Sequence, residues 1–302
     1  MLDILFLGTG ASVPSKDRAL PCVAVRRGPD IVLFDCGEGS QRQLMISPFS
    51  FMKIRAIFVT HLHGDHFYGL PGLLQTMGMM GRRDPFIVCG PQGFSEALRT
   101  CLDICEGDLE YDLESRDVSP GDVVAVKDMT VSVFATEHGI TSQGYVLREP
   151  DVRGRIDAKK AASLGIEGKD FSVIEDGGEV NGVRLGDISD PAKKGISVAY
   201  TGDTRMCQSV RDAVEGVDVL IHESTYMEQE SSLAEEHFHS TAVQAASLAR
   251  DAGCGTLMLV HISNRYKEPE KVLGEARAVF PRTYAPSDME RYRVTGSGVR
   301  SV

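Results

Sequence analysis

Four side chains that can bind a metal ion lie within six residues of one another near residue 60. The motif HLHGDH supplies His61, His63, Asp65 and His66, and it follows the apolar run 56–59. Imidazole and carboxylate groups are donors that suit zinc and neighbouring transition metals. The sequence therefore predicts a metal site in the turn after this run. We expect Gly64 to supply the backbone freedom that the turn needs.

Three further side chains of these types each follow an apolar run that is predicted to form a strand. They are His138 after 130–135, Asp203 after 197–200 and His261 after 256–260. Because sites in α/β sheets assemble at the carboxyl ends of strands, we expect all seven side chains to meet there. Seven ligands are too many for one tetrahedral zinc ion. The set therefore predicts two ions about 3.5–4 Å apart, bridged by Asp203, that would activate a water.

Short β-rich runs and amphipathic segments alternate along the chain, which predicts a layered α/β fold of one domain over residues 1–302. The expected strands are Asp3–Leu7, Cys22–Arg26, Ile31–Phe34, Ala56–Thr60, Phe86–Cys89, Thr130–Ala135, Ser197–Tyr200, Asp218–Ile221 and Thr256–Val260. The expected helices are Gly69–Met80, Phe94–Cys105, Ser209–Glu215, Ala242–Ala252 and Glu268–Val279.

The segment 148–182 departs from this alternation, since it is rich in glycine and charged residues and holds few large apolar side chains. Loops of this length are unusual inside compact domains and are often functional. We interpret the segment as an inserted basic arm. Between residues 148 and 169 it carries four acidic residues against six basic ones, namely Arg148, Arg153, Arg155, Lys159, Lys160 and Lys169. The alternative is a solvated surface excursion without a binding role.

Bulk composition limits the partners and the location of the protein. The net charge of −11 argues against broad, non-specific nucleic-acid binding but is compatible with a local basic site. No apolar run approaches the roughly 20 residues of a membrane span. The first ten residues are expected to form a strand and turn rather than a signal peptide. Seven scattered cysteines without a CxxC pair suit a reducing compartment, so we expect a cytoplasmic protein.

The HLHGDH motif, together with His138, Asp203 and His261, resembles the metallo-β-lactamase superfamily. Further motifs resemble the short form of one of its families, ribonuclease Z, whose members are endonucleases that mature tRNA 3′ ends. In chain order these motifs are FLGTGASVP at 6–14, FDCGEG at 34–39, GLPGL at 69–73, YTGDTR at 200–205, HESTY at 222–226, HST at 239–241 and HISNRY at 261–266. Two departures concern substrate docking. Residues 164–171 lack the Gly-Pro stretch usual in the family's arm, and Ala19 follows Arg18 where the family often has Arg-Asn.

The resemblance implies an αββα sandwich with a flexible inserted arm, two Zn²⁺ per subunit, and a homodimer in which the arm of one subunit serves the other's site. It also implies hydrolysis of the phosphodiester at the 3′ end of precursor tRNA, leaving a 3′-hydroxyl tRNA and a 5′-phosphorylated trailer. Asp65 would bind metal and accept the proton of the attacking water. His239, oriented by Glu223, would donate a proton to the leaving 3′ oxygen. Arg265 would bind a neighbouring phosphate.

Several alternatives stay open on the sequence alone. His222 and His237 also suit the general-acid role, Glu223 would also suit a buried structural position, and Arg265 an ordinary surface. Manganese or iron could occupy the same nitrogen and oxygen ligands. The main alternative function is a small-molecule hydrolase of the same fold, such as an arylsulfatase or lactonase. A non-catalytic RNA-binding module is a third possibility, which the complete ligand set disfavours.

Overall fold

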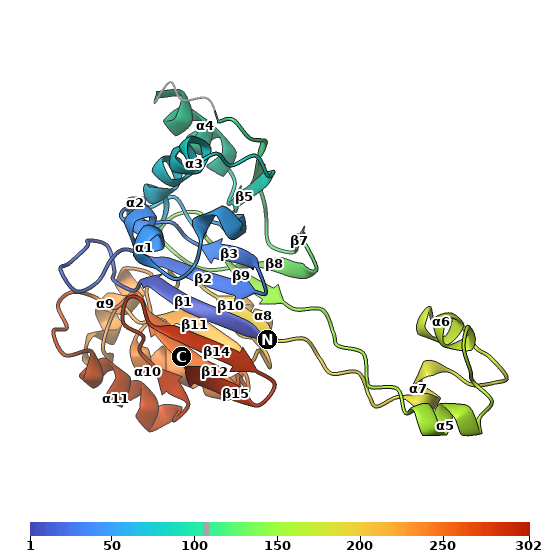
Figure 1. Ribbon diagram of the computed structural model, residues 1–302. Helices are drawn as coiled ribbons and strands as arrows, with labels where there is room; N and C mark the ends of the chain where they lie inside the picture. The colour runs from blue at the N-terminus through green and yellow to red at the C-terminus, as the bar shows by residue number, and fades with distance from the viewer. Residues whose placement is uncertain (105–108) are drawn as a thin grey trace. The chain divides into compact units, whose positions relative to one another are not determined.

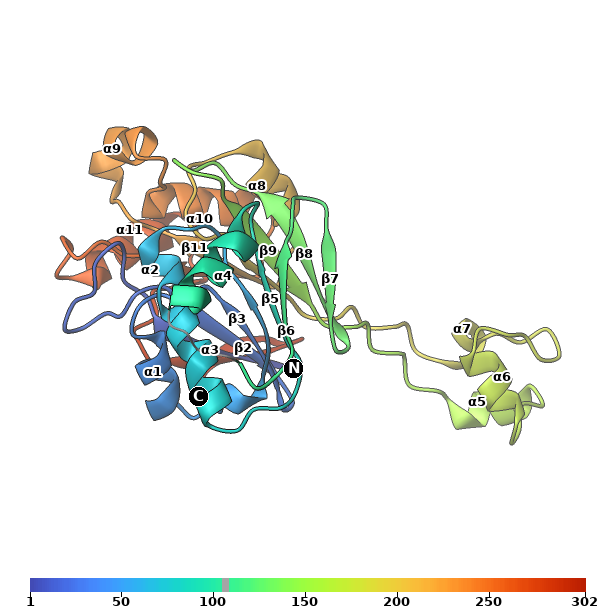
Figure 2. The ribbon, with the colours of Figure 1, turned by 90° about the horizontal axis from the view of Figure 1, so that it is seen from above.

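A computed structural model describes residues 1–104 and 109–302 of the chain. The chain divides into two compact units, residues 1–148 together with 196–302 and residues 149–195. The larger unit contains two β-sheets that pack face to face, with helices on their outer sides (Figure 1, Figure 2). This arrangement is the expected four-layer α/β sandwich, which is thereby confirmed.

The described residues form one sheet of eight strands and one of seven. In spatial order, the first sheet contains β15 (Gly298–Ser301), β14 (Arg291–Thr295), β1 (Leu2–Gly8), β2 (Cys22–Arg27), β3 (Asp30–Phe34), β4 (Ile54–Phe58), β5 (Phe86–Gly90) and β6 (Leu113–Asp117). The second contains β13 (Thr283–Tyr284), β12 (Thr256–Val260), β11 (Val219–Glu223), β10 (Ser197–Tyr200), β9 (Gln143–Arg148), β8 (Met129–Ala135) and β7 (Val123–Val126). Both sheets mix parallel and antiparallel pairs.

The central strands are buried on both faces. In β1, Leu2, Ile4 and Phe6 belong to the core between the two sheets, whereas Leu5 and Leu7 belong to the core under the outer helices. Side chains alternate across a strand, so each sheet shares one apolar layer with its partner sheet and another with its helices. This double burial explains why the strands read as continuous apolar runs in the sequence.

Helices cover the outer face of each sheet. Those on the first sheet are α1 (Ser40–Ile46), α3 (Gly69–Met79) and α4 (Phe94–Ile104), and those on the second are α8 (Gln208–Ala213), α10 (Ala242–Asp251) and α11 (Pro269–Val279). Shorter elements in the loops are α2 (Gly64–Phe67), α9 (Ser231–Glu236) and the 3₁₀ turns Phe51–Lys53 and Glu228–Glu230. The expected helix Phe94–Cys105 ends at Ile104, and Cys105 lies outside the described residues. No helix in the described ranges is long and apolar enough to cross a membrane.

The smaller unit, Glu149–Gly195, contains three short helices that the sequence did not predict. They are α5 (Ala158–Ser163), α6 (Asp170–Glu175) and α7 (Leu185–Ile188). The unit buries its own apolar cluster, formed by Ala161, Ile166, Ile174, Val183 and Ile188. The expected arm of 148–182 overlaps this unit, which continues to Gly195. Over the whole unit, ten Asp and Glu outnumber eight Lys and Arg, so the basic excess is confined to residues 148–169.

Candidate functional site

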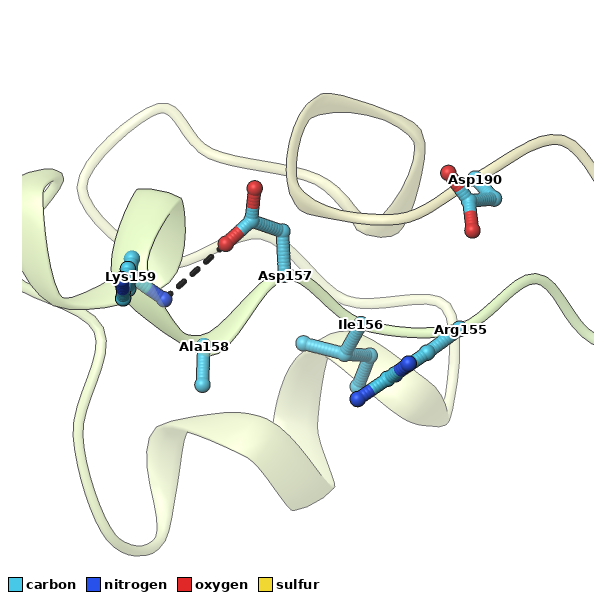
Figure 3. Close-up of a pocket in the computed structure, with 6 residues that line it drawn as sticks. All are labelled: Arg155, Ile156, Asp157, Ala158, Lys159 and Asp190. Carbon is cyan, nitrogen blue, oxygen red and sulfur yellow. Dashed lines mark hydrogen bonds between the residues drawn. The ribbon is translucent and has the colours of Figure 1, made fainter.

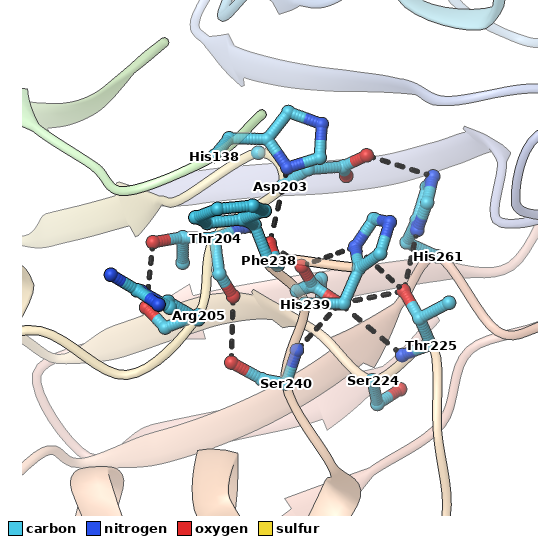
Figure 4. A network of polar contacts seen from close by, with 12 residues as sticks. His138, Asp203, Thr204, Arg205, Ser224, Thr225, Phe238, His239, Ser240 and His261 are labelled. Carbon is cyan, nitrogen blue, oxygen red and sulfur yellow. Dashed lines mark hydrogen bonds and ion pairs between the residues drawn. The ribbon is translucent and has the colours of Figure 1, made fainter. Parts of the chain in front are cut away.

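The carboxyl ends of four strands bring the seven expected metal ligands together. The loop from β4 into α2 carries His61, His63, Asp65 and His66, while His138 follows β8, Asp203 follows β10 and His261 follows β12. Ligand atoms lie within 4.8 Å of one another in three overlapping groups, namely His61 with His63 and His138, His61 with His66 and Asp203, and Asp65 with His66 and His261. Figure 4 shows how His138, Asp203 and His261 converge from separate elements.

Three nitrogen atoms form the first cluster of ligand atoms. His63 Nδ1 lies 3.0 Å from His61 Nε2 and 3.2 Å from His138 Nε2. With metal–nitrogen bonds of about 2.0–2.1 Å, the nitrogens around a tetrahedral ion lie about 3.3 Å apart. The spacing of the three imidazoles therefore fits one face of a tetrahedral metal site.

Two carboxylates and two imidazoles form the second cluster. Asp65 Oδ2 lies 3.6 Å from His66 Nε2 and 3.5 Å from His261 Nε2. Asp203 Oδ2 lies 3.4 and 3.3 Å from the same two nitrogens. It also lies 3.8 Å from His61 Nε2, which belongs to the first cluster. A carboxylate oxygen within reach of both clusters is placed to bridge two ions.

Hydrogen bonds on the outer side of four imidazoles decide which ring nitrogen carries the proton. The Nδ1–H groups donate from His61 to Thr60 Oγ1, from His66 to Asp35 Oδ2, from His138 to the Phe238 carbonyl and from His261 to Thr225 Oγ1. The two threonine hydroxyls accept these bonds because their own protons go to carboxylates, Asp35 and Glu223. In the neutral form of each ring, Nε2 therefore carries the lone pair and faces the clusters, and this is the tautomer that binds metal.

Three buried polar atoms that have no hydrogen-bond partner in the described part of the chain lie in these two clusters of ligand atoms. Among the described residues, the Nε2 atoms of His66 and His261 and the Oδ1 atom of Asp203 are buried and have no hydrogen-bond partner. Buried polar atoms in native proteins are nearly always satisfied. The donor chemistry, the spacing and these unsatisfied atoms all fit divalent metal ions, so the residues present are suited to hold them.

Asp35 supports this site, although its place in the sequence predicted no role for it. It directly follows β3 and adopts a left-handed φ of 57°. Its Oδ2 accepts hydrogen bonds from His66 Nδ1 at 2.7 Å and from the Tyr200 hydroxyl at 2.8 Å. Its Oδ1 accepts from the Thr60 amide at 2.7 Å. The available signal was a carboxylate immediately after a strand, in the FDCGEG motif.

The electrostatics of His61, His63 and Asp65 favour the protonation states that metal binding requires. Burial lowers the pKa of His61 well below its usual value, and the neighbouring His66 lowers it further. Burial also lowers the pKa of His63, with His138 adding to the effect. For Asp65, burial acts to raise the pKa, but the imidazoles of His261 and His66 outweigh it and lower the pKa to about 2. At neutral pH, Asp65 is therefore ionised, and His61 and His63 are neutral. For His66, burial acts to lower the pKa, but the carboxylates of Asp203 and Asp35 outweigh it and raise the pKa well above its usual value, so a metal ion would have to displace a proton there.

Glu223 and His239 form a hydrogen-bonded pair beside the clusters. Glu223 ends β11 and is fully buried, and its Oε1 accepts from His239 Nδ1 at 2.8 Å. Burial opposes protonation of His239, but the Glu223 charge raises its pKa to about 9. The His239 ring centroid lies 5.0 Å from that of His138. Since Nδ1–H is committed to Glu223, Nε2 is the atom of His239 that can hand a proton to a bound substrate.

The two other histidines considered for this role are placed differently. His222 is fully buried, with its Nδ1 on the Glu223 carbonyl at 2.8 Å. His237 is exposed at the end of α9 and stacks on Tyr226 at a centroid distance of 6.4 Å. His239 alone of the three joins the groups of candidate ligands within the described residues.

Comparison with known proteins decides the family. Residues 31–262 match the β-lactamase superfamily domain. Ribonuclease Z from Methanosarcina mazei is 39% identical over 300 residues, which cover 97% of this chain and 98% of that protein. Ribonuclease Z from Methanothermobacter thermautotrophicus is 40% identical over 297 residues, with 96% and 95% covered. The chain belongs to the ribonuclease Z family. Among solved structures, the short form of human tRNase Z superposes with a TM-score of 0.71 at 25% identity, covering 97% of this chain and 99% of that one.

Arg265 and Gly64 have contacts that the sequence did not predict. Arg265 lies over the Tyr226 ring at 4.9 Å, and its Nη1 donates to Glu230 at 2.9 Å. Its Nε also donates to Ser263 Oγ at 3.2 Å, so two of the five guanidinium N–H donors are already paired. The expectation for Gly64 is wrong, because Gly64 begins α2 without a left-handed φ. A Cβ there would lie 2.5 Å from the Tyr68 ring, so close packing explains this glycine.

Proposed function

We propose that this protein is a metal-dependent endoribonuclease that cuts precursor tRNA at the 3′ end of the mature sequence, leaving a 3′-hydroxyl tRNA and a 5′-phosphorylated trailer. The observation that carries the proposal is the pair of ligand clusters joined by Asp203, with the Glu223–His239 pair beside them. The family membership supports the substrate, because the relatives at 39–40% identity over nearly the full length are ribonuclease Z enzymes.

The residues divide the reaction between them. The first cluster would hold one ion through His61, His63 and His138, and Asp65, His66 and His261 would hold the other, with Asp203 shared. Bound divalent ions would supply an activated water and would neutralise charge on the phosphoryl oxygens. Asp65 would bind through Oδ2, which faces His66 and His261, and its other oxygen would accept the proton of the attacking water. His239 would donate from Nε2 to the leaving 3′ oxygen while Glu223 holds the ring through Nδ1.

The proposal is tested with a 3′-extended precursor tRNA and purified protein, with and without chelator. The expected result is a single cut that chelator abolishes and added metal restores, with a 3′ hydroxyl on the tRNA and a 5′ phosphate on the trailer. Asp65→Ala should abolish the cut while tRNA binding persists. Hydrolysis of an aryl sulfate or a lactone without any precursor cleavage would contradict the proposal and favour a small-molecule hydrolase.

We also propose that the inserted unit Glu149–Gly195 docks the tRNA. Its first part carries exposed basic side chains, including Arg153, Arg155, Lys159 and Lys160. Arg155 and Lys159 line a cavity of about 430 Å³ together with Asp157 and Asp190 (Figure 3). Recognition of folded RNA depends largely on shape and phosphate contacts, for which such side chains are suited.

Charge variants separate docking from chemistry. The double variant Arg155→Ala/Lys159→Ala should raise the KM for precursor tRNA, leave kcat unchanged and reduce the salt dependence of binding by about two charges. Arg184→Ala is the matched control, because Arg184 is exposed in the same unit but already paired with Glu179 at 2.7 Å. Equal effects of the two changes, or none, would contradict a docking role for the first part of the unit.

Removal of the whole unit is a second test. Arg148 and Ser197 are opposite each other in the ladder between β9 and β10, so a short glycine-containing turn that leads into Ile196 can replace 149–195. The shortened protein should fold, bind metal and hydrolyse bis(p-nitrophenyl) phosphate, but process precursor tRNA poorly. Normal tRNA processing would exclude a docking role. Loss of both activities in a folded, shortened protein would mean that the unit contributes to the metal site.

We further propose that the protein acts as a homodimer. The resemblance implies it, and exposed apolar side chains on α1 and at the end of α3 support it. Met45 and Ile46 are 59% and 57% exposed, and Met79 and Met80 are 80% and 60% exposed. Light scattering should give twice the 32.8 kDa chain mass. Ile46→Glu should lower that mass towards the monomer, whereas Val123→Glu, equally exposed on β7, should not.

Zinc is the metal that we propose, at two ions per subunit. Imidazole and carboxylate ligands, with tetrahedral spacing in the first cluster, favour it, although manganese and iron accept the same ligands. Elemental analysis of active protein decides both identity and number. We also place the protein in the cytoplasm, where the thiols of Cys22, Cys36 and Cys254, which are buried and unoxidised, would stay reduced.

A further inference from the structure

Phe238 occupies a backbone conformation that glycine normally provides. Helix α9 ends at Glu236 and is followed by His237 and then Phe238, which has a φ of 58°. The Phe238 amide donates to the Glu235 carbonyl at 3.3 Å and the His239 amide donates to the Ala234 carbonyl at 2.8 Å. This pair of bonds is the Schellman ending of a helix, in which the left-handed position is usually glycine. A phenylalanine there is strained, and such strain concentrates at functional sites.

The backbone of Phe238 links two parts of the proposed catalytic machinery. Its carbonyl accepts the Nδ1–H of His138 at 3.1 Å and so orients a metal-ligand imidazole from behind. The next residue is His239, the proposed acid, so the same turn sets the position of both rings. Figure 4 shows Phe238 between His138 and His239 in this network.

The side chain of Phe238 is held by a cation that joins three loops of the site. The Arg205 guanidinium lies 4.8 Å from the centroid of the Phe238 ring. Its Nε donates to Glu137, the neighbour of His138, and its Nη1 donates to Glu235 in α9, both at 2.8 Å. Arg205 itself follows the bridging ligand Asp203 by two residues. The ring and the guanidinium therefore connect the loops that carry Asp203, His138 and His239.

We propose that Phe238, held by Arg205, is a positioning residue that fixes the orientations of the His138 and His239 imidazoles relative to each other. The proposal rests on the proposed function for the role of His239, but not for the orientation of His138. It accounts for a bulky residue at a glycine position, because glycine would satisfy the turn without giving Arg205 a ring to hold.

Comparing glycine with alanine at this position separates positioning from stability. Phe238→Gly and Phe238→Ala both remove the ring, but glycine adopts the left-handed conformation without strain. The glycine variant should therefore melt at a higher temperature than the alanine variant. Both should show kcat reduced by about tenfold or more with KM for precursor tRNA changed by less than about twofold, since small misplacements of catalytic groups cost rate rather than binding. Phe238→Tyr keeps the ring and should restore kcat to within about twofold of the unaltered protein.

Arg205→Gln tests the other side of the contact between Arg205 and Phe238. Alone it should lower kcat, and combined with Phe238→Gly it should add little, because contacting residues are not additive. Arg282→Gln is the matched control, since Arg282 lies over the Phe280 ring at 5.7 Å outside the site. That change should leave kcat unaltered.

Metal affinity, measured by competition with a chelating dye, is the readout that does not depend on the substrate. Loss of the carbonyl alignment behind His138 should weaken one metal about tenfold in Phe238→Gly, as is typical for outer partners of metal ligands. Unchanged affinity and unchanged kcat in this variant would overturn the proposal, and so would rates that follow melting temperature across the series. If the unaltered protein does not cleave precursor tRNA, the proposed function fails, while the metal affinities still decide whether Phe238 positions His138.

Discussion

Asp35→Asn is expected to weaken metal binding although Asp35 is not itself a ligand. The contacts of its carboxylate all come from donors, namely the Thr60 amide and hydroxyl, His66 Nδ1 and the Tyr200 hydroxyl. Asparagine replaces one oxygen by an NH₂ group. Whichever way the amide turns, a donor then faces a donor in a buried place, where no water can relieve the conflict.

The expected loss of metal affinity depends on how His66 responds to the asparagine. Leaving the buried donors unsatisfied costs about 1–3 kcal/mol. If His66 avoids the conflict by moving its proton to Nε2, its lone pair no longer faces the metals. Replacing such an outer partner typically lowers metal affinity about 10–100-fold, which corresponds to about 1.4–2.8 kcal/mol. Unsatisfied donors and a changed His66 tautomer have similar free-energy costs, so we expect metal affinity to fall within this range in either case.

A chelating dye that competes for the metal measures the affinity directly. Asp218→Asn is the matched control, because Asp218 also accepts from an amide and a hydroxyl, both of Ser197, but lies before β11, at the opposite end from Glu223. The control should keep its metal affinity. An Asp35→Asn variant with unaltered affinity, or a control that loses as much, would refute the reasoning about the His66 tautomer.

Three further predictions concern the acid pair, the metals and the ion pairs of Asp3. His239→Ala and Glu223→Ala should each slow precursor cleavage by about 10²–10⁴-fold, and the double variant should lose little more because the residues act as one unit; fully multiplicative losses in single-turnover assays would separate them. Elemental analysis should find two ions per active subunit, and one ion or none would refute the bridging role of Asp203. Burial acts to raise the pKa of Asp3, but the guanidinium groups of Arg293 and Arg26 outweigh it and lower the pKa. Its contribution to stability is therefore present at neutral pH and lost as the pH falls below about 4, so Asp3→Asn should destabilise the fold at pH 7 but much less at pH 3 in thermal melts.

Much of the site could be predicted from sequence because its ligands follow directly from local order. A strand that is buried on both faces reads as an apolar run, and the residue after it must lie at the sheet edge. His61, His138, Asp203 and His261 each lie within three residues after a strand, so ligand types and strand ends together indicated one shared site. The same logic failed for β6, β14 and β15, whose exposed faces carry charged side chains and hide the strand pattern.

Contacts between distant segments were decided only by the tertiary structure. Asp35 meets His66 and Tyr200, which is 165 residues away, and Thr225 meets His261 across 36 residues. These bonds set the imidazole tautomers, yet no local pattern announces them, because hydrogen-bond partners are chosen by proximity in space. The helices of Glu149–Gly195 were missed for a related reason, since each is only four to six residues long and buries a single apolar side chain. Such short helices are stable only through the contacts they make with one another.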